Sequence, residues 1–186
     1  MEKRKIESLS EATRLINHGP CLIISVGDKT KDNLFTVAWN MPLRKDPPLV
    51  AIETGKGHYS YDFIARTGEF AMNVPPATII KSVVAAGTIT GAAVEDKFQK
   101  VGLTREAAEH IKAPLVAEAV ANLECRVCQV VDMGASALLI AQVVSARVSC
   151  GLFDENGWNF TNGLQFMHHL GGSHFAVSER KIHSGS

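Results

Sequence analysis

The stretch that decides the fold is residues 34–53, LFTVAWNMPLRKDPPLVAIE. Successive side chains of a strand point to opposite faces, so residues 34–41 can be divided with a period of two. One face, which we predict to be the core face, carries Phe35, Val37, Trp39 and Met41. The other face is small and mildly polar and carries Thr36, Ala38 and Asn40. The stretch therefore predicts a strand that carries only small side chains on one face. A loop through Pro47-Pro48 and a second strand, LVAIET, follow it.

Similar patterns predict further strands. The segments CLIISVG (21–27) and EFAMNV (69–74) read as strands, and two long alternating segments, 118–132 and 136–150, read as a β-hairpin. The helical signals are shorter and less regular. They comprise an N-terminal helix opened by a capping box at Ser8 and Glu11, a helix over 62–67 that stops at Gly68, and an irregular region from 77 to about 111.

About six strands with local connections predict a mainly β fold, a closed antiparallel barrel with peripheral helices, in one domain spanning residues 1–186. The alternative is a parallel α/β sheet. It is less favoured because a parallel crossover needs a dozen or more residues, and helices do not regularly separate these strands.

Composition narrows the function classes. The chain has 186 residues, a formal net charge of zero and 46% hydrophobic residues. We expect no nucleic-acid partner, because no basic excess exists to neutralise phosphates. We also expect no membrane association, because no apolar run reaches the roughly 18–20 residues of a spanning helix. The charged N-terminus lacks the apolar region of a signal peptide, which together with four cysteines favours a cytoplasmic protein.

Two groups of residues of types that can bind metals, a pair of cysteines and three histidines, are expected to have structural roles instead. A strand places Cys125 and Cys128 on opposite faces, so we expect two unpaired thiols and no metal. The C-terminal run FMHHLGGSHFAV carries His168, His169 and His174, but adjacent histidines diverge, and Gly171 with Gly172 favours a turn over a ligand-binding loop. No Ser–His–Asp or Cys–His arrangement is recognisable, so catalytic residues stay unassigned and an enzyme would depend on a cofactor.

The segment GKGHYSYDF (55–63) could bind an anion. A glycine-bearing loop that runs into a helix N-terminus, with Ser60 as its N-cap, offers free N–H groups to a phosphate. Lys56 and the Ser60 hydroxyl would then contact the phosphate. The alternative is an exposed loop with an ordinary cap, and since no P-loop or dinucleotide fingerprint is present, local sequence leaves both open.

Taken together, these segments resemble the flavin reductase-like family of FMN-binding split-barrel proteins, in the branch of flavoredoxins and ferric reductases. The resemblance is carried by TVAWNMPLRKDPPLVAIE (36–53), GKGHYSYDFIARTGEFAMNVP (55–75), EDKFQKVGL (95–103) and APLVAEAVANLECRV (113–127). It implies a six-stranded antiparallel Greek-key split barrel and a homodimer with FMN near the subunit interface.

The resemblance also implies which residues bind FMN. The bare face of residues 36–40 would accept the isoalloxazine ring while backbone groups bond its polar edge, residues 56–61 would bind phosphate, and residues 73–75 would line the flavin site. The implied residues are Thr36, Val37, Ala38, Trp39, Asn40, Thr54, Lys56, His58, Ser60, Tyr61, Asn73, Val74 and Pro75. Three features depart from the family pattern, and one of them is the HHLGG tail (168–172), which is only loosely similar to other members. Ser136 stands where a histidine associated with the nicotinamide cofactor often stands, and the motif TGAAVEDKF (90–98) is one residue longer and lacks a basic residue.

Three functions are compatible with this pattern. The first is an FMN-dependent oxidoreductase that takes electrons from NAD(P)H or a protein donor and passes them to flavin, iron or protein acceptors. The second is a flavoredoxin-like electron carrier without a nicotinamide site of its own, which Ser136 favours. The third is a non-flavin binding module on the same barrel, since fold alone does not specify function.

Overall fold

The computed structural model describes residue 1, residues 5–7 and residues 9–183, so the predicted capping residue Ser8 lies outside the described residues. The strands of its main sheet are β1 (Leu22–Gly27), β2 (Asp32–Val37), β3 (Asn40–Lys45), β4 (Pro48–Gly55), β5 (Glu69–Val74), β8 (Ala121–Asp132) and β9 (Ser136–Val148). Three two-stranded pairs are β6 (Arg105–Glu106) with β7 (Leu115–Val116), β10 (Phe153–Asp154) with β11 (Gly157–Trp158), and β12 (Phe166–Gly171) with β13 (His174–Ser178). The α-helices are α1 (Tyr59–Thr67), α2 (Ile80–Thr88) and α3 (Lys97–Val101), and 3-10 helices cover Leu9–Leu15, Ala77–Ile79 and Gly91–Ala93.

The main sheet is antiparallel and runs in the order β2-β1-β5-β8-β9-β4-β3. It curls around a core that includes Ile24, Ile52, Phe70 and Leu139. The edge strands β2 and β3 are not hydrogen-bonded to each other along the described chain, so the barrel is split rather than closed. The predicted mainly β split barrel is confirmed, with seven strands in this sheet where six were expected.

The extra strand comes from the segment predicted as one strand over 34–41. The chain leaves β2 at Val37 and enters β3 at Asn40, and these two strands lie at opposite edges of the sheet. Residues 38 and 39 belong to neither strand, so the in-and-out alternation of side chains in β2 does not carry over into β3. The prediction of a core position is therefore confirmed for Val37, which is 7% exposed, and wrong for Trp39 and Met41, which are 53% and 48% exposed. The prediction of a second strand after Pro47 is confirmed by β4, which pairs with β3.

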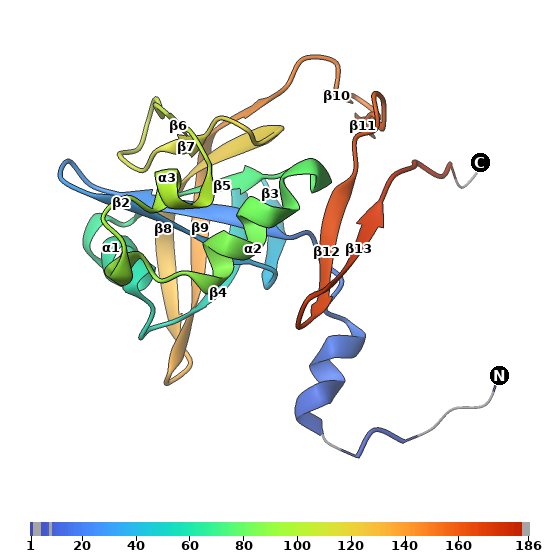
Figure 1. The fold of residues 1–186 in the computed structure, drawn as a ribbon, viewed down its shortest axis with the longest axis horizontal. Helices are drawn as coiled ribbons and strands as arrows, with labels where there is room; N and C mark the ends of the chain where they lie inside the picture. Colours follow the sequence, from blue (N-terminus) through green and yellow to red (C-terminus); the bar gives the residue numbers. More distant parts are fainter. Residues whose placement is uncertain (2–4, 8, 184–186) are drawn as a thin grey trace.

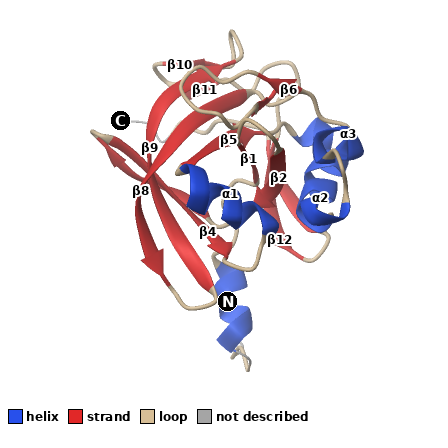
Figure 2. Ribbon diagram, turned by 90° about the vertical axis from the view of Figure 1, so that its left-hand side faces the viewer, coloured by secondary structure: helices blue, strands red, loops and turns tan. Residues whose placement is uncertain are grey.

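The helices pack on the outside of the barrel. Helix α1 begins after His58, and it ends at Gly68, whose left-handed φ of 67° allows its N–H to donate to Ile64 O at 2.8 Å. The prediction that Gly68 ends this helix is confirmed. Helices α2 and α3 lie side by side against β2 (Figure 2). None of the helices in the described ranges has the length and apolar character needed to cross a membrane.

Two hairpins complete the fold. The predicted pairing of the segments 118–132 and 136–150 is confirmed by β8 and β9, on which Cys125 is buried and Cys128 exposed. The C-terminal hairpin of β12 and β13 lies beside α2 (Figure 1) and turns at Gly172 and Ser173, so the turn predicted at Gly171 and Gly172 lies one residue later, with Gly171 as the last residue of β12. It is joined to the barrel by backbone bonds from Cys21 N to Met167 O and from Ala77 N to Gln165 O, both 2.8 Å.

The exposed position of Trp39 gives a first prediction. Trp39→Ala should lower the free energy of unfolding by about 1 kcal/mol or less, because half of this side chain is already in water. Phe70→Ala removes a fully buried ring and should cost about 3–5 kcal/mol. Urea unfolding of both variants measures the difference, and equal losses would contradict the placement of Trp39.

Candidate functional site: a groove along strand β2

Two hollows that meet along β2 form one groove. The first, of about 300 Å³, is lined by Asn17, Phe35, Thr36, Val37, Ala38, Trp39, Glu53, Thr54, His58 and His169. The second, of about 230 Å³, is lined by Asn33, Phe35, Thr36, the start of α1 from Gly57 to Ser60, residues 86–91 and Lys97. Both include Phe35, Thr36 and His58, so they adjoin each other at these residues. We call the first the ring end and the second the polar end of the groove.

Small side chains keep the groove open between its two ends. Val37 points into the barrel core, whereas Thr36 faces α2 and donates a hydrogen bond from its hydroxyl to Val83 O. Gly87 of α2 lies opposite, and a β-carbon there would come within 3.3 Å of Thr36 Cβ. A larger residue at either position would narrow the passage, which explains why a small face on β2 is matched by a glycine on α2.

His58 occupies the junction of the two ends. It is the residue before α1, with extended backbone angles and no side-chain cap bond. Its ring packs on Gly55, where a β-carbon would come within 3.2 Å of it, and Nδ1 lies 3.4 Å from Thr54 Oγ1. Helix α1 therefore begins beside the polar end. Tyr61 N donates to His58 O at 2.9 Å, whereas the N–H groups of Tyr59 and Ser60 precede any helical carbonyl that could accept from them.

The polar end also holds a buried lysine. The Lys97 side chain is 4% exposed, and its ammonium group donates to Ala86 O at 2.8 Å. Burial lowers the pKa of Lys97 to about 8, because desolvation disfavours the charged form. An ammonium group has three N–H donors, so a bound anion can accept from it and restore the charge that burial opposes. Lys97 and the N-terminus of α1 together make the polar end suitable for an anion.

A buried amide in the polar end lacks one partner. Asn33 is 1% exposed and donates from Nδ2 to Ser60 Oγ at 2.8 Å. Its Oδ1 accepts no hydrogen bond from any residue that the structure describes, although a buried polar atom normally has a partner. Gly91 lies so close that a β-carbon there would overlap the Asn33 side chain. A ligand hydroxyl in the polar end would satisfy Oδ1.

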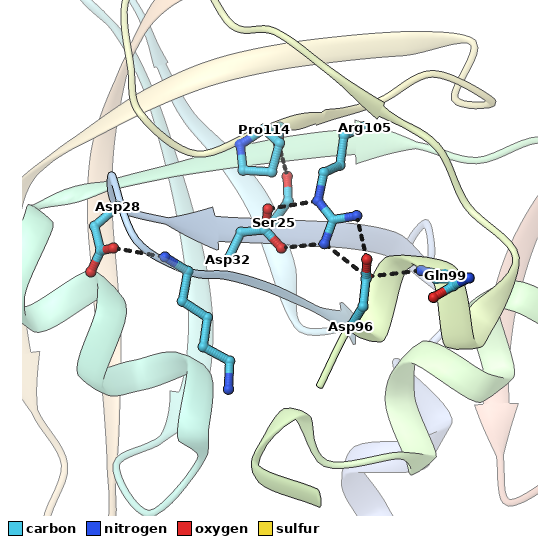
Figure 3. Close-up of polar contacts among 8 residues, drawn as sticks. Ser25, Asp28, Asp32, Asp96, Gln99, Arg105 and Pro114 are labelled. Atoms are coloured by element: carbon cyan, nitrogen blue, oxygen red, sulfur yellow. Dashed lines mark hydrogen bonds and ion pairs between the residues drawn. The ribbon is translucent and has the colours of Figure 1, made fainter. Parts of the chain in front are cut away.

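An arginine connects the two elements that carry Asn33 and Lys97 (Figure 3). Arg105 binds Asp32 through Nε and Nη2 at 2.7 and 2.8 Å, and binds Asp96 through Nη1 and Nη2 at 3.0 and 2.8 Å. Its guanidinium also lies 4.5 Å from the centre of the Phe98 ring. The hydrogen bonds to Asp32 and then to Asp96 raise the pKa of Arg105, and the bond from Arg105 lowers the pKa of Asp96. Arg105 therefore fixes the spacing between β2 and α3.

The structure brings together some of the residues predicted to bind a cofactor. Thr36, Val37, Ala38, Trp39 and Thr54 line the ring end, Ser60 lines the polar end and His58 lines both. Asn40 lines an adjoining hollow with Ala38 and Trp39. The prediction of Ser60 as N-cap is wrong: the N-cap is His58, two residues earlier, and Ser60 is buried in the first turn of the helix.

Other predicted residues do not line the groove. The Lys56 ammonium pairs with Asp132 at 2.5 Å, in the turn between β8 and β9. Asn73 is fully buried in a network with Ser25 and Asn122. Three further predicted residues, Tyr61, Val74 and Pro75, are absent from the lining of either end.

Sequence reasoning missed several polar residues of the groove, among them Asn17 and Glu53 at the ring end and Thr88 and Thr90 at the polar end. Asn33 and Lys97 line the polar end, and His169 lines the ring end. Lys97 belongs to the EDKF segment that carries the family resemblance, and this was the signal that could have identified it. Asn33 lies in a polar stretch that predicts only a turn, and His169 reaches the groove through a hairpin whose position the sequence does not indicate.

Comparison with known proteins identifies the family. Residues 13–166 match the model of the flavin reductase like domain. The chain belongs to this family. YddH, described as an uncharacterized protein of Escherichia coli strain K12, is 32% identical over 182 residues, which cover 95% of this chain and 96% of that protein.

Solved structures share the fold. Flavoredoxin of Desulfovibrio vulgaris (Miyazaki F) superposes with a TM-score of 0.84 at 21% identity, covering 98% of this chain and 97% of the other. An FMN-binding domain of a flavin reductases-like enzyme from Shewanella baltica OS155 superposes with a TM-score of 0.81 at 24% identity, covering 96% and 95% of the two chains. The expected family and fold are confirmed by these matches.

Arg105 gives a prediction for stability. Arg105→Ala should lower the free energy of unfolding by about 1–2 kcal/mol at neutral pH, because two carboxylates lose a bidentate partner that is partly exposed to solvent. The contribution of Asp96 is fully present above its ordinary pKa of 3.8 and is lost as the pH falls through the lowered value in the folded protein. Urea unfolding at several pH values should therefore show the difference from wild type shrinking below that pH.

A matched variant, Arg180→Ala, removes an exposed arginine near the C-terminus and should change stability by no more than about 0.5 kcal/mol. If Arg105→Ala were as mild as Arg180→Ala at neutral pH, Arg105 would not stabilise the fold.

Proposed function

We propose that the groove binds FMN and that the protein is a flavin-dependent oxidoreductase. Membership of the flavin reductase-like family supports this proposal, as does the structural likeness to a protein named as FMN-binding. The observation that carries it is the pairing, in one groove, of an end suited to an anion with an end bordered by Thr36, Ala38 and the aromatic rings of Phe35 and Trp39. FMN has the same division between a charged phosphate and a flat ring.

The residues of the groove fit the three parts of FMN. The N–H groups at the start of α1 and the Lys97 ammonium would hold the phosphate. The unpartnered Asn33 Oδ1 would accept a hydrogen bond from a hydroxyl of the ribityl chain. Thr36 and Ala38 would border the isoalloxazine ring, and backbone groups of residues 36–40 would bond its polar edge. Bound FMN would supply the capacity to accept and donate electrons that the side chains lack.

The proposal differs from the sequence-based prediction in its phosphate ligands. Lys56 is paired with Asp132 and is replaced in this role by Lys97. His58, Thr54 and Ser60 stay as groove residues. Tyr61, Asn73, Val74 and Pro75 line neither end of the groove, so they are not proposed as FMN contacts.

We further propose NAD(P)H as the electron donor, with a protein donor as the second candidate. The observation that favours the second is Ser136, which begins β9 opposite Gly55 and has a hydroxyl where the family often has a histidine. A flavoredoxin-like carrier would hold FMN in the same groove and exchange electrons with a protein partner.

A homodimer is also part of the proposal. Three large exposed side chains, Ile16, Trp39 and Met41, line a mainly apolar hollow of about 420 Å³ that shares Ala38 and Trp39 with the ring end. A second copy on this surface would exclude water from these side chains and from the adjoining ring end. Analytical ultracentrifugation tests it, and a monomer that retains FMN at micromolar concentration would contradict it.

The phosphate assignment predicts a difference between two lysines. Lys97→Met should weaken FMN binding at least tenfold, because a charge-assisted hydrogen bond contributes about 1.5–3 kcal/mol. Lys56→Met, the matched control, should change FMN affinity by less than about threefold, since Lys56 is paired elsewhere. Fluorescence titrations with FMN and riboflavin measure both. Equal losses for the two flavins in Lys97→Met would mean that Lys97 does not bind phosphate.

The donor is tested by anaerobic spectroscopy. The FMN-loaded protein should show a flavin absorption band that NADH or NADPH bleaches under anaerobic conditions. A band that neither nucleotide bleaches, but that dithionite does, would favour the electron carrier. A protein that takes up no FMN would refute the proposed function.

A further inference from the structure

A third cavity opens beside the ring end of the groove. It measures about 600 Å³, within the range of small-molecule sites. We call it the hairpin pocket. One wall of the pocket is a face of α2, and a second wall is the β12–β13 hairpin. Its base is formed by the end of β2 and by Cys21, the residue before β1. The lining residues are Cys21, Thr36, Ala38, Ile80, Val83, Val84, Gly87, Thr88, His169, Gly172, Ser173 and Phe175.

The hairpin pocket and the ring end share a boundary. Thr36, Ala38 and His169 line both. A molecule in the hairpin pocket would therefore lie against the same three residues as a molecule in the ring end. This adjacency suits a compound that exchanges electrons with the ligand of the groove.

The walls select for apolar compounds. No Asp, Glu, Lys or Arg is among the lining residues within the described ranges of the chain. Val83 is fully buried, Cys21 is 4% exposed, and burial raises the pKa of the Cys21 thiol to about 11, so it is neutral at physiological pH. A charged acceptor would lose its hydration here without gaining a counter-ion.

His169 supplies a polar group at the shared boundary. Its Nε2 lies 3.0 Å from Gly172 O, and its ring centroid lies 5.2 Å from that of Phe175. These contacts orient the imidazole. An imidazole can act as a general acid, and the half-buried ring of His169 is in contact with solvent.

We propose that the hairpin pocket binds the electron acceptor, a flat and uncharged cyclic carbonyl compound of the quinone class, and that His169 donates the proton its reduction requires. This inference rests on the proposed function, which supplies the reduced flavin. With FMN bound, the reduced cofactor would supply a hydride and His169 a proton, so that the two carbonyls of the quinone would become the hydroxyls of a hydroquinone. Solvent would then return a proton to His169.

Binding is tested without turnover, by titrating 1,4-naphthoquinone into the protein and following intrinsic fluorescence, with and without oxidised FMN. Val84→Trp should fill the pocket and weaken naphthoquinone binding about tenfold or more, with FMN affinity unchanged. The matched control, Lys81→Trp, places the same ring on an exposed position of α2 outside the pocket lining and should alter neither affinity.

Proton donation is tested by stopped-flow oxidation of the reduced protein in the absence of oxygen. His169→Gln should bind naphthoquinone within about threefold of wild type, while the ratio of its naphthoquinone rate to its ferricyanide rate falls about 100-fold, because ferricyanide accepts an electron without a proton. His174→Gln, on an exposed position of the same hairpin, should keep the wild-type ratio.

The outcomes separate this inference from the proposed function. If FMN binds but Val84→Trp leaves naphthoquinone affinity intact, the hairpin pocket is not the acceptor site. An unchanged rate ratio in His169→Gln would overturn the role of His169. If FMN does not bind at all, the proposed function fails, and the naphthoquinone titration of the FMN-free protein still decides whether the pocket binds such a ring.

Discussion

The rest of the structure depends on the position of β2, an edge strand whose alternate side chains point to two different compartments. Val37 packs in the barrel core, while Thr36 faces α2 and contacts Val83 O. Because β2 pairs with β1 on one side only, its other edge is available to line cavities. Thr36 accordingly lines the polar end, the ring end and the hairpin pocket.

Electrostatics organises the polar end. Arg105 binds Asp32 and Asp96, the neighbours in sequence of Asn33 and Lys97. The two buried polar residues are thereby held at a fixed separation by an interaction that lies outside the groove. Lys97 is desolvated, which opposes its charge, and Asn33 has an unsatisfied oxygen. Both conditions are relieved by a ligand that brings an anion and a hydroxyl, and this is the physical basis of the proposed FMN site.

Much of the fold could be predicted from local patterns. Alternation identified β1, β5 and the β8–β9 hairpin, and Gly68 correctly marked the end of α1. The error at Trp39 and Met41 has a definite cause: the hydrophobic alternation continues through residues 38–39, where the chain leaves one edge of the sheet for the other. Periodicity describes side-chain direction within a strand and carries no information about where one strand gives way to the next.

The site was only partly predictable for a related reason. Thr36, Ala38, His58 and Ser60 lie on segments whose local character already indicated small side chains and a helix N-terminus. Lys97 and His169 reach the groove from α3 and from the C-terminal hairpin. The EDKF segment was a sequence signal for Lys97, whereas the position of His169 follows only from tertiary packing. Lys56 was a reasonable phosphate ligand from spacing, but a carboxylate 76 positions later in the sequence, Asp132, binds it.

The most direct test of the central claim is a crystal structure of the protein with FMN. The account predicts that the phosphate lies within hydrogen-bond distance of the Lys97 ammonium and the first N–H groups of α1, with the isoalloxazine ring against Thr36 and Ala38. A phosphate bound beside Lys56 and Asp132, or a ring remote from β2, would contradict it.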